Sequence, residues 1–407
     1  MIHPGGCLVC VGLAACLAGQ VTAPRLPDPP PVPPERGGFA QLLRAEKYVG
    51  PGVFGVADPA AEGADGAAGF RLRADFERHA GVALVADRLA RDFPKTFGRL
   101  VPAIASRARL VAIVADDDAA GPVRAALRRA GVAEDRVRWV QSPTDTIWIR
   151  DFGPVFVEAS DGSRRAFDFD YRRRSGTKRR DRDDAAAASI ARQLEITAVP
   201  SAMLIEGGNL LSNGCGLLLM STTAVNANVA RGYEPETVTR YLGAVFGART
   251  IVVLEPLRRE PTGHVDTFAC FTDARTVVVG RCSRERDPEN AALLDRNAAL
   301  LAGVRTAEGP LRVVRVPMPP GDDDRRRTYT NGVLLGGTLL MPTYRDADRQ
   351  LEAAALQTFR RLLPGWKVVG IDASELIARD GALRCVTLPV PRGAAAGSGV
   401  PSSPGAR

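Results

Sequence analysis

The chain has 407 residues, of which 45% are hydrophobic and 25% charged, and these are the proportions of a soluble globular protein with a large core. Its formal net charge of +8 comes largely from clusters of arginine. Few aromatic residues lie among these arginines, and no helix-turn-helix or zinc-finger spacing occurs, so we do not expect nucleic acid as a partner.

The first residues are expected to be a secretory leader, residues 1–23. Its apolar run, Leu8 to Ala18, is too short to span a bilayer as a helix. Within the run, Leu13-Ala14-Ala15-Cys16 resembles the bacterial lipoprotein processing box, in which the cysteine becomes lipidated. We therefore expect export to the periplasm or cell surface, with a membrane anchor at Cys16.

Composition predicts three further segments. Residues 24–67 are expected to be a linker, because residues 24–36 contain seven prolines and favour an extended spacer. Residues 68–391 are expected to form a single catalytic domain. The remaining residues, 392–407, are rich in Gly, Ala, Ser and Pro and are expected to be disordered.

From about residue 68, short apolar runs typical of strands alternate with amphipathic helical patterns. Apolar runs occur at 79–85, 110–114, 155–158, 164–169, 202–205, 217–220, 250–254, 276–280, 311–316, 333–342 and 367–371. Helical patterns occur at 89–105 with a break near Pro94, and at 119–130, 184–194, 235–246, 289–302, 347–362 and 374–378. This alternation predicts an α/β fold.

Polar residues stand at the ends of five strands, at intervals of 55, 60, 65 and 54 residues. They are Asp151, Glu206, Asp266, Asn331 and Cys385. Each interval holds about one strand pair, one helix and one further strand. A period of this size predicts repeated units around an axis, each contributing a residue to a central site.

Histidine is scarce, with only His3, His79 and His264 in the chain. His3 lies in the expected leader, and His79 opens a strand and is expected to be structural. His264 is therefore the main candidate for an acid or base. On an extended segment His264 and Asp266 would point to the same side, although a purely structural polar pair is the alternative.

These side chains suit chemistry on a guanidinium group. Two carboxylates can hold the planar cation through paired hydrogen bonds, and a thiolate can attack its central carbon. His264 would protonate the departing ammonia and then activate water, with Glu206 orienting it. We expect neither a metal nor a cofactor. The remaining cysteines of the domain, Cys215, Cys270 and Cys282, show no zinc spacing, and a disulfide between Cys270 and Cys282 stays open.

Five motifs occur in order: Trp-Ile-Arg-Asp-Phe-Gly-Pro at 148–154, Glu-Gly-Gly-Asn at 206–209, Gly-His-Val-Asp at 263–266, Tyr-Thr-Asn at 329–331, and Cys-Val-Thr at 385–387. In these motifs the chain resembles the agmatine deiminases and bacterial peptidylarginine deiminases of the guanidine-modifying (pentein) superfamily. The resemblance implies a five-bladed α/β propeller of ββαβ units around a central active site.

The resemblance also implies a role for each motif residue. Cys385 is expected to be the nucleophile and His264 the acid/base, supported by Glu206. Asp151 and Asp266 are expected to clamp the guanidinium. Asn331 is expected to line the site. Trp148 is expected either to form a wall of the guanidinium slot or to be a core aromatic.

The chain departs from the family pattern just before the nucleophile, where a glycine triplet and a histidine are usual but only Gly381 and Arg384 stand. The segment 171–174 is closer to the peptidylarginine enzymes, in which arginines hold a substrate carboxylate, and Arg173 is the candidate here. We therefore expect hydrolytic deimination of peptidyl or free arginine. Agmatine deimination for putrescine synthesis, amidino transfer and binding of arginine peptides without turnover remain as alternatives. The oligomeric state stays open.

Overall fold

The computed structural model describes residues 49–56, 69–171, 180–307, 309–320 and 325–392. The expected leader with Cys16, most of the expected linker, Arg173 and nearly all of the expected C-terminal tail lie outside the described residues. Within the described ranges, none of the helices combines the length and the apolar character that crossing a membrane requires.

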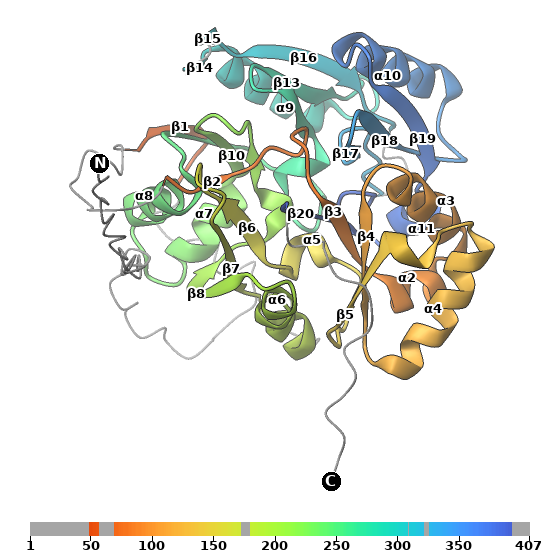
Figure 1. Ribbon diagram of the computed structural model, residues 1–407. Helices are drawn as coiled ribbons and strands as arrows, with labels where there is room; N and C mark the ends of the chain where they lie inside the picture. The colour runs from red at the N-terminus through yellow and green to blue at the C-terminus, as the bar shows by residue number, and fades with distance from the viewer. Residues whose placement is uncertain (1–48, 57–68, 172–179, 308, 321–324, 393–407) are drawn as a thin grey trace, which may run out of the picture.

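The strands form five sheets that Figure 1 shows arranged around a common centre. The first sheet has the order β20 (Leu388–Val390), β3 (Gly81–Val85), β4 (Arg109–Val114), β5 (Val137–Gln141). The second has β2 (Arg71–Leu72), β6 (Val155–Glu158), β7 (Arg164–Asp170), β8 (Thr197–Leu204). The third has β1 (Gly52–Gly55), β11 (Thr250–Leu254), β10 (Leu217–Ser221), β9 (Leu211–Ser212).

The other two sheets have three strands each. The fourth has β12 (Ala269–Asp273), β13 (Thr276–Arg281), β16 (Arg312–Pro317), and the fifth has β17 (Val333–Leu335), β18 (Thr338–Thr343), β19 (Lys367–Asp372). A separate short hairpin joins β14 (Arg305–Thr306) and β15 (Gly309–Pro310).

All five sheets contain the same unit, an antiparallel strand pair followed by a parallel strand after a helical crossover. The parallel partners are β3·β4, β7·β8, β10·β11, β13·β16 and β18·β19. In the first sheet the antiparallel partner is β20, so the C-terminal strand pairs with β3 and closes the ring. The predicted α/β propeller of five ββαβ units is confirmed.

The helices connect the strands within each unit. They are α2 (Ala86–Asp92), α3 (Pro94–Ala105), α4 (Asp117–Arg129), α6 (Asp181–Gln193), α7 (Thr222–Val229), α8 (Pro235–Phe246), α9 (Pro288–Ala302), α10 (Arg349–Leu362) and α11 (Ser374–Ile377). The predicted break at Pro94 is confirmed, because this proline begins α3 where its missing N–H costs nothing. Four single turns complete the chain: η1 (Glu134–Arg136), α5 (Ile149–Phe152), η2 (Gly207–Asn209) and η3 (Val265–Thr267).

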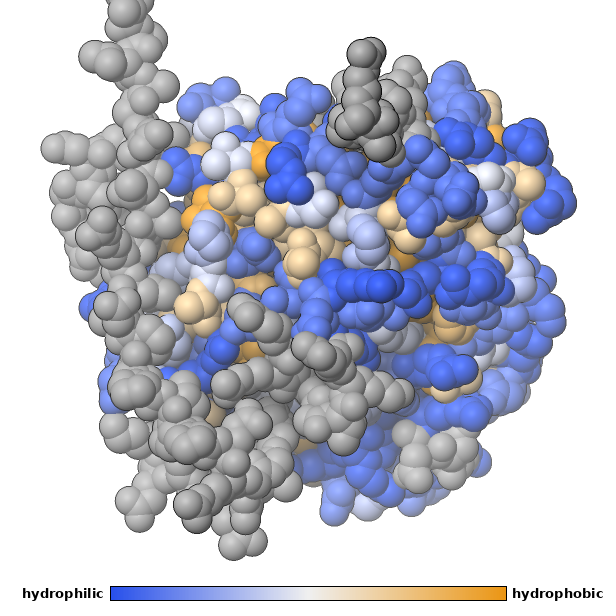
Figure 2. Space-filling model, turned by 90° about the horizontal axis from the view of Figure 1, so that it is seen from below, coloured by the Kyte–Doolittle hydropathy of each residue, from blue (hydrophilic) through white to orange (hydrophobic). Residues whose placement is uncertain are grey.

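Apolar residues from the sheets and helices form the core between the layers. The largest cluster joins α2, α3, α4 and β4 to β18 and α10, so it spans the first and last units. Among the described residues, the large hydrophobic side chain that is exposed to solvent is that of Val53. The face in Figure 2 is mostly hydrophilic, with smaller apolar areas between the polar ones.

The structure corrects the predicted domain boundary. Residues 52–55 were expected to be linker, but they form β1, which pairs antiparallel with β11 at the edge of the third sheet. Phe54 packs against the core of that unit. The folded domain therefore includes residues N-terminal to 68.

Several elements differ from the predicted ones. β5, α7 and β20 were not predicted. The apolar run 333–342 was not divided in the prediction, but it forms the hairpin β17–β18, because Gly336 and Gly337 adopt the positive φ angles of a tight turn.

Candidate active site

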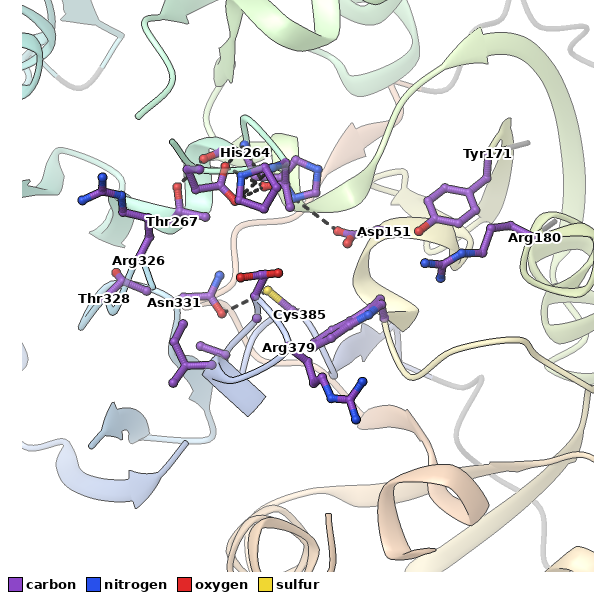
Figure 3. A pocket seen from close by; sticks show the side chains of 18 residues that line it. Asp151, Tyr171, Arg180, His264, Thr267, Arg326, Thr328, Asn331, Arg379 and Cys385 are labelled. Atoms are coloured by element: carbon purple, nitrogen blue, oxygen red, sulfur yellow. Dashed lines mark hydrogen bonds and ion pairs between the residues drawn. The ribbon is translucent and has the colours of Figure 1, made fainter. Parts of the chain in front are cut away.

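A cavity of about 240 Å³ opens at the centre of the ring. Figure 3 shows the side chains that line it and labels ten of them. Its lining residues include Cys385, His264, Asp151, Asn331 and Trp148. The structure thus brings five predicted site residues from four distant parts of the chain into one cavity, and it places Trp148 in the wall.

Cys385 lies between α11 and β20, and its side chain is buried. Its Sγ lies 3.4 Å from Asn331 Oδ1, to which the thiol can donate. Burial raises the pKa of the thiol well above its ordinary value, and the charges of Asp266 and Asp151 raise it further. Without a bound cation, the thiol is therefore protonated at neutral pH.

His264 immediately precedes η3 and is also buried. Its Nε2 lies 2.5 Å from Glu206 Oε2, and its Nδ1 lies 3.6 Å from Asp151 Oδ1. Glu206 does not line the cavity, so it supports the imidazole from behind. A histidine held between two carboxylates has a fixed ring orientation and can donate or accept a proton.

The turn η2 fixes the spacing of these groups. The backbone N–H of Gly208 donates to Asp151 Oδ1 at 3.2 Å. A Cβ atom at Gly208 would lie 2.4 Å from His264 Nδ1 and 2.7 Å from Asp151 Oδ1. A residue with a side chain would push these groups apart, which explains the glycine here.

The prediction that His264 and Asp266 share one side of a strand is wrong. Val265–Thr267 form the helical turn η3, so the two side chains contact different groups. Asp266 is fully buried and is not among the residues that line the cavity. Its Oδ2 lies 2.7 Å from Arg384 Nη1, whereas its Oδ1 is buried without a hydrogen-bond partner among the described residues.

Asp151 also lies in a helical turn, α5, rather than at a strand end. This turn places Arg150 on the opposite side of the backbone, where it contacts Asp75 at 3.7 Å. Asp75 in turn accepts a hydrogen bond of 2.7 Å from Arg384 Nε. A second, smaller hollow contains Asp75, Arg150, Arg384 and His79, so His79 lies apart from the cavity.

Sequence reasoning missed the charged residues at the mouth of the cavity. They are Arg180, Arg326, Arg379, Glu260 and Asp380. Figure 3 shows Arg326 on the opposite side of Cys385 from Arg180 and Arg379. Asp380 has a φ of 63°, a conformation that glycine adopts most readily, and it lies beside Gly381. The departure from the usual glycine triplet before Cys385 was the available signal.

The other three cysteines of the expected domain are not among the residues that line the cavity. Cys215, Cys270 and Cys282 are all free, so the structure has no disulfide between Cys270 and Cys282. Among the described residues, no group of three or more His, Cys, Asp or Glu side chains is arranged to hold a metal ion.

Comparison with known proteins gives one consistent family. Residues 72–391 match the family of Porphyromonas-type peptidyl-arginine deiminases. A Streptomyces coelicolor protein, named provisionally as an agmatine deiminase, is 30% identical over 289 residues, which are 67% of this chain and 83% of that protein. The agmatine deiminase of Ectopseudomonas mendocina is 26% identical over 65% of this chain and 80% of its own.

Solved structures agree in fold. A Porphyromonas gingivalis protein, described provisionally as an arginine deiminase, superposes with a TM-score of 0.68 at 27% identity, covering 80% of this chain and 99% of that one. The agmatine deiminase of Enterococcus faecalis superposes with a TM-score of 0.67 at 20% identity, covering 79% of this chain and 96% of that one.

Proposed function

The chain belongs to the Porphyromonas-type peptidyl-arginine deiminase family, and from that premise we propose that it deiminates arginine through Cys385. The protein is a hydrolase that acts on the carbon–nitrogen bonds of linear amidines and converts a guanidino group to a ureido group. We propose the role of each residue in this reaction and arginine as the substrate.

The proposed reaction has two halves. A guanidinium bound beside Asp151 lowers the cost of ionising Cys385, whose proton passes to solvent, and the thiolate attacks the central carbon to form a C–S bond. One C–N bond then breaks, and ammonia leaves with a proton from His264. In the second half His264 removes a proton from water, the resulting hydroxide attacks the same carbon, and the C–S bond breaks to give the ureido product and free Cys385.

The observation that carries this mechanism is the position of His264. It lines the cavity together with Cys385 and Asp151, while Glu206 holds its Nε2 at 2.5 Å. A buried thiol, an imidazole and a carboxylate around one cavity are the minimum that both halves require. Because these groups are held in fixed positions, less entropy is lost in reaching the transition state than between free reactants in solution.

Charge at the mouth supports arginine rather than agmatine. Arg180, Arg326 and Arg379 line the opening, and of its two carboxylates Glu260 accepts hydrogen bonds from the loop N–H groups of Thr262 and Gly263. Arg180 and Arg326 form ion pairs with Asp183 and Asp287, at 3.4 and 2.8 Å, so the support comes mainly from Arg379. Its guanidinium would favour a substrate that carries a carboxylate and disfavour the cationic amine of agmatine. Arg173, proposed for the same task, lies outside the described residues.

A substrate panel tests this choice. Free arginine, a peptide with C-terminal arginine, a peptide with internal arginine and agmatine are compared by ureido colorimetry. We expect the highest kcat/KM for a substrate with a free carboxylate on the arginine. A higher kcat/KM for agmatine would contradict the proposal.

Agmatine deimination is the second candidate function. Asp380 lines the cavity and could bind the terminal amine of agmatine, and curated relatives of this chain are named agmatine deiminases. Asp380→Ala separates the two candidates. The agmatine hypothesis expects KM for agmatine to rise about tenfold on loss of this ion pair, whereas the arginine hypothesis expects little change in KM for arginine.

We also propose that the protein is exported and anchored through Cys16. The support is the sequence of residues 13–16 alone. Palmitate labelling of the full chain that survives Cys16→Ser would contradict this proposal.

A further inference from the structure

The residue before the nucleophile occupies the centre of the ring. The side chain of Arg384 is 4% exposed, yet four of its hydrogen bonds reach three separate segments. Its Nε binds Asp75 Oδ2 and its Nη1 binds Asp266 Oδ2, both at 2.7 Å. The Nη1 and Nη2 groups also donate to the backbone carbonyls of Gly207 and Leu210, at 3.3 and 3.0 Å.

The backbone of Arg384 is held as firmly as its side chain. Its N–H donates to Asn331 Oδ1 at 3.0 Å, the same oxygen that lies 3.4 Å from Cys385 Sγ. Its carbonyl oxygen accepts from Arg150 Nε at 3.4 Å. Arg384 therefore contacts segments from every motif around the ring and fixes the backbone from which Cys385 projects.

The contact with Asp266 is unusual because it is incomplete. An arginine can bind both oxygens of a carboxylate, but Arg384 holds only Oδ2 and leaves Oδ1 buried without a partner among the described residues. An unpartnered buried carboxylate oxygen is costly unless a ligand completes its hydrogen bonds. Arg384 therefore supplies the cation that stabilises this buried carboxylate, through Oδ2.

We propose that Arg384 is a positioning residue for deimination, which holds Asp266 by one oxygen behind the cavity and offsets the carboxylate charge around Cys385. This inference rests on the proposed role of Cys385. Nothing in the family pattern supplies it, since a histidine is usual at this position.

Several charged or titratable groups surround Cys385. They are Asp266 on η3, Asp151 and Arg150 on α5, Arg384 next to it in the chain, His264 before η3, and Arg379 and Asp380 on the rim. Arg384 lowers the pKa of Cys385, against the two carboxylates that raise it. Loss of Arg384 should therefore decrease the thiolate fraction at a given pH.

Alkylation of Cys385 by iodoacetamide tests this effect without requiring turnover. The adduct on the Cys385 peptide is quantified by mass spectrometry across about pH 7 to 10, because other cysteines also react. We expect Arg384→Met to slow alkylation about tenfold at a fixed pH, as for a pKa rise of about one unit. Arg384→Lys, which restores the charge, should come within about threefold of wild type.

Asp75→Asn is the matched control. It removes the other ion pair of Arg384 but leaves the contact with Asp266, so alkylation should be as fast as in wild type or faster. If Arg384→Met left the alkylation rate unchanged, or if Asp75→Asn slowed it equally, Arg384 would be merely structural and the inference would be wrong.

Turnover by the same variants completes the test. We expect kcat/KM to fall at least about 100-fold in Arg384→Met and to be partly restored in Arg384→Lys. Arg384→Gln, which also removes the charge, replaces Arg384→Met if Arg384→Met does not fold. A rate no different from wild type in both assays for the uncharged variant would overturn the inference. A wild type inactive on every guanidine would instead contradict the proposed function, while alkylation would still decide the role of Arg384.

Discussion

At the scale of single residues, the site combines groups that are individually unfavourable in a protein interior. Cys385, His264 and Asp266 are buried, and Asp266 has one oxygen without a partner among the described residues. Burial and neighbouring carboxylates raise the pKa of Cys385, so the thiol ionises more readily once a cation is bound. In the proposed mechanism, this arrangement keeps the thiol of Cys385 protonated until substrate binds.

His264→Ala should reduce kcat by about 1000-fold, because both proton transfers of the proposed reaction pass through the imidazole. Glu206→Gln should reduce kcat by a smaller factor, since it weakens the contact that orients His264 but leaves the imidazole in place. Steady-state ureido formation measures both. His79→Ala is the control, because His79 lies outside the cavity, and its kcat should match wild type.

Asp75 should make the stability of the protein sensitive to acid. Burial would raise the pKa of Asp75, but the guanidinium groups of Arg384 and Arg150 lower it to about 2, from an ordinary value of 3.8. A lowered pKa contributes stability that is fully present above about pH 4 and is lost as the pH falls through about 2.

The free energy of unfolding of Asp75→Asn should therefore lie below that of wild type at pH 5, and the gap should narrow by about 2 kcal/mol as the pH falls to about 2. Urea unfolding at several pH values measures this gap. Asp135→Asn, at an exposed position, is the control for the loss of a carboxylate that has no buried ion pair to lose. If the difference in free energy of unfolding between Asp75→Asn and wild type did not change with pH, the ion pairs of Asp75 would not explain its lowered pKa.

The motif residues were predictable from sequence because the chemistry needs their types and histidine is scarce. Asp75, Arg150 and Arg384 were not recognised as a network, because their contacts join positions far apart in the sequence. The separation of Asp266 from the cavity was equally hidden, since it depends on whether residues 265–267 are extended or helical.

At the scale of elements, short turns rather than regular strands carry the site. α5, η2 and η3 each place one or two polar groups at the centre, and backbone geometry sets their spacing. Periodicity predicts long helices and strands well, and α8 and β11 have the predicted bounds. Periodicity does not predict single helical turns or two-residue strands, because tertiary packing determines them.

Gly208→Ala should reduce kcat at least about tenfold, because its Cβ would lie 2.4 Å from His264 Nδ1 and would displace the imidazole. Overpacking should also lower the free energy of unfolding by about 1 to 3 kcal/mol. Gly98→Ala is the matched control: it lies within α3, and an added Cβ meets nothing within 4 Å. That control should keep its kcat and gain up to about 1 kcal/mol of stability.

The edge strand β1 should contribute to stability although composition predicted a linker there. Phe54→Ala should lower the free energy of unfolding by about 2 kcal/mol, because half-buried Phe54 packs against the third unit. Val53→Ala, at a side chain that is 49% exposed, should change it by less than about 0.5 kcal/mol. Equal effects of the two substitutions would show that β1 does not pack as described.

At the scale of the whole molecule, five units of one topology surround one cavity, and the C-terminal strand β20 completes the first unit. Ring closure brings Cys385, near the end of the chain, to Asp151 and His264, which lie far from it in the sequence. The repeat period was readable from the spacing of polar residues. The closure of the ring could not be predicted from sequence, because β20 has only three residues.

The central claim is that Cys385 forms a covalent intermediate with a guanidino substrate. The most direct measurement is acid quenching of wild-type protein during turnover, followed by mass spectrometry of the Cys385 peptide, beside ureido assays of Cys385→Ala. We predict an amidino adduct on Cys385 in wild type and no ureido product above background in Cys385→Ala. Product formation by Cys385→Ala at the wild-type rate, or an adduct on a different cysteine, would contradict the account.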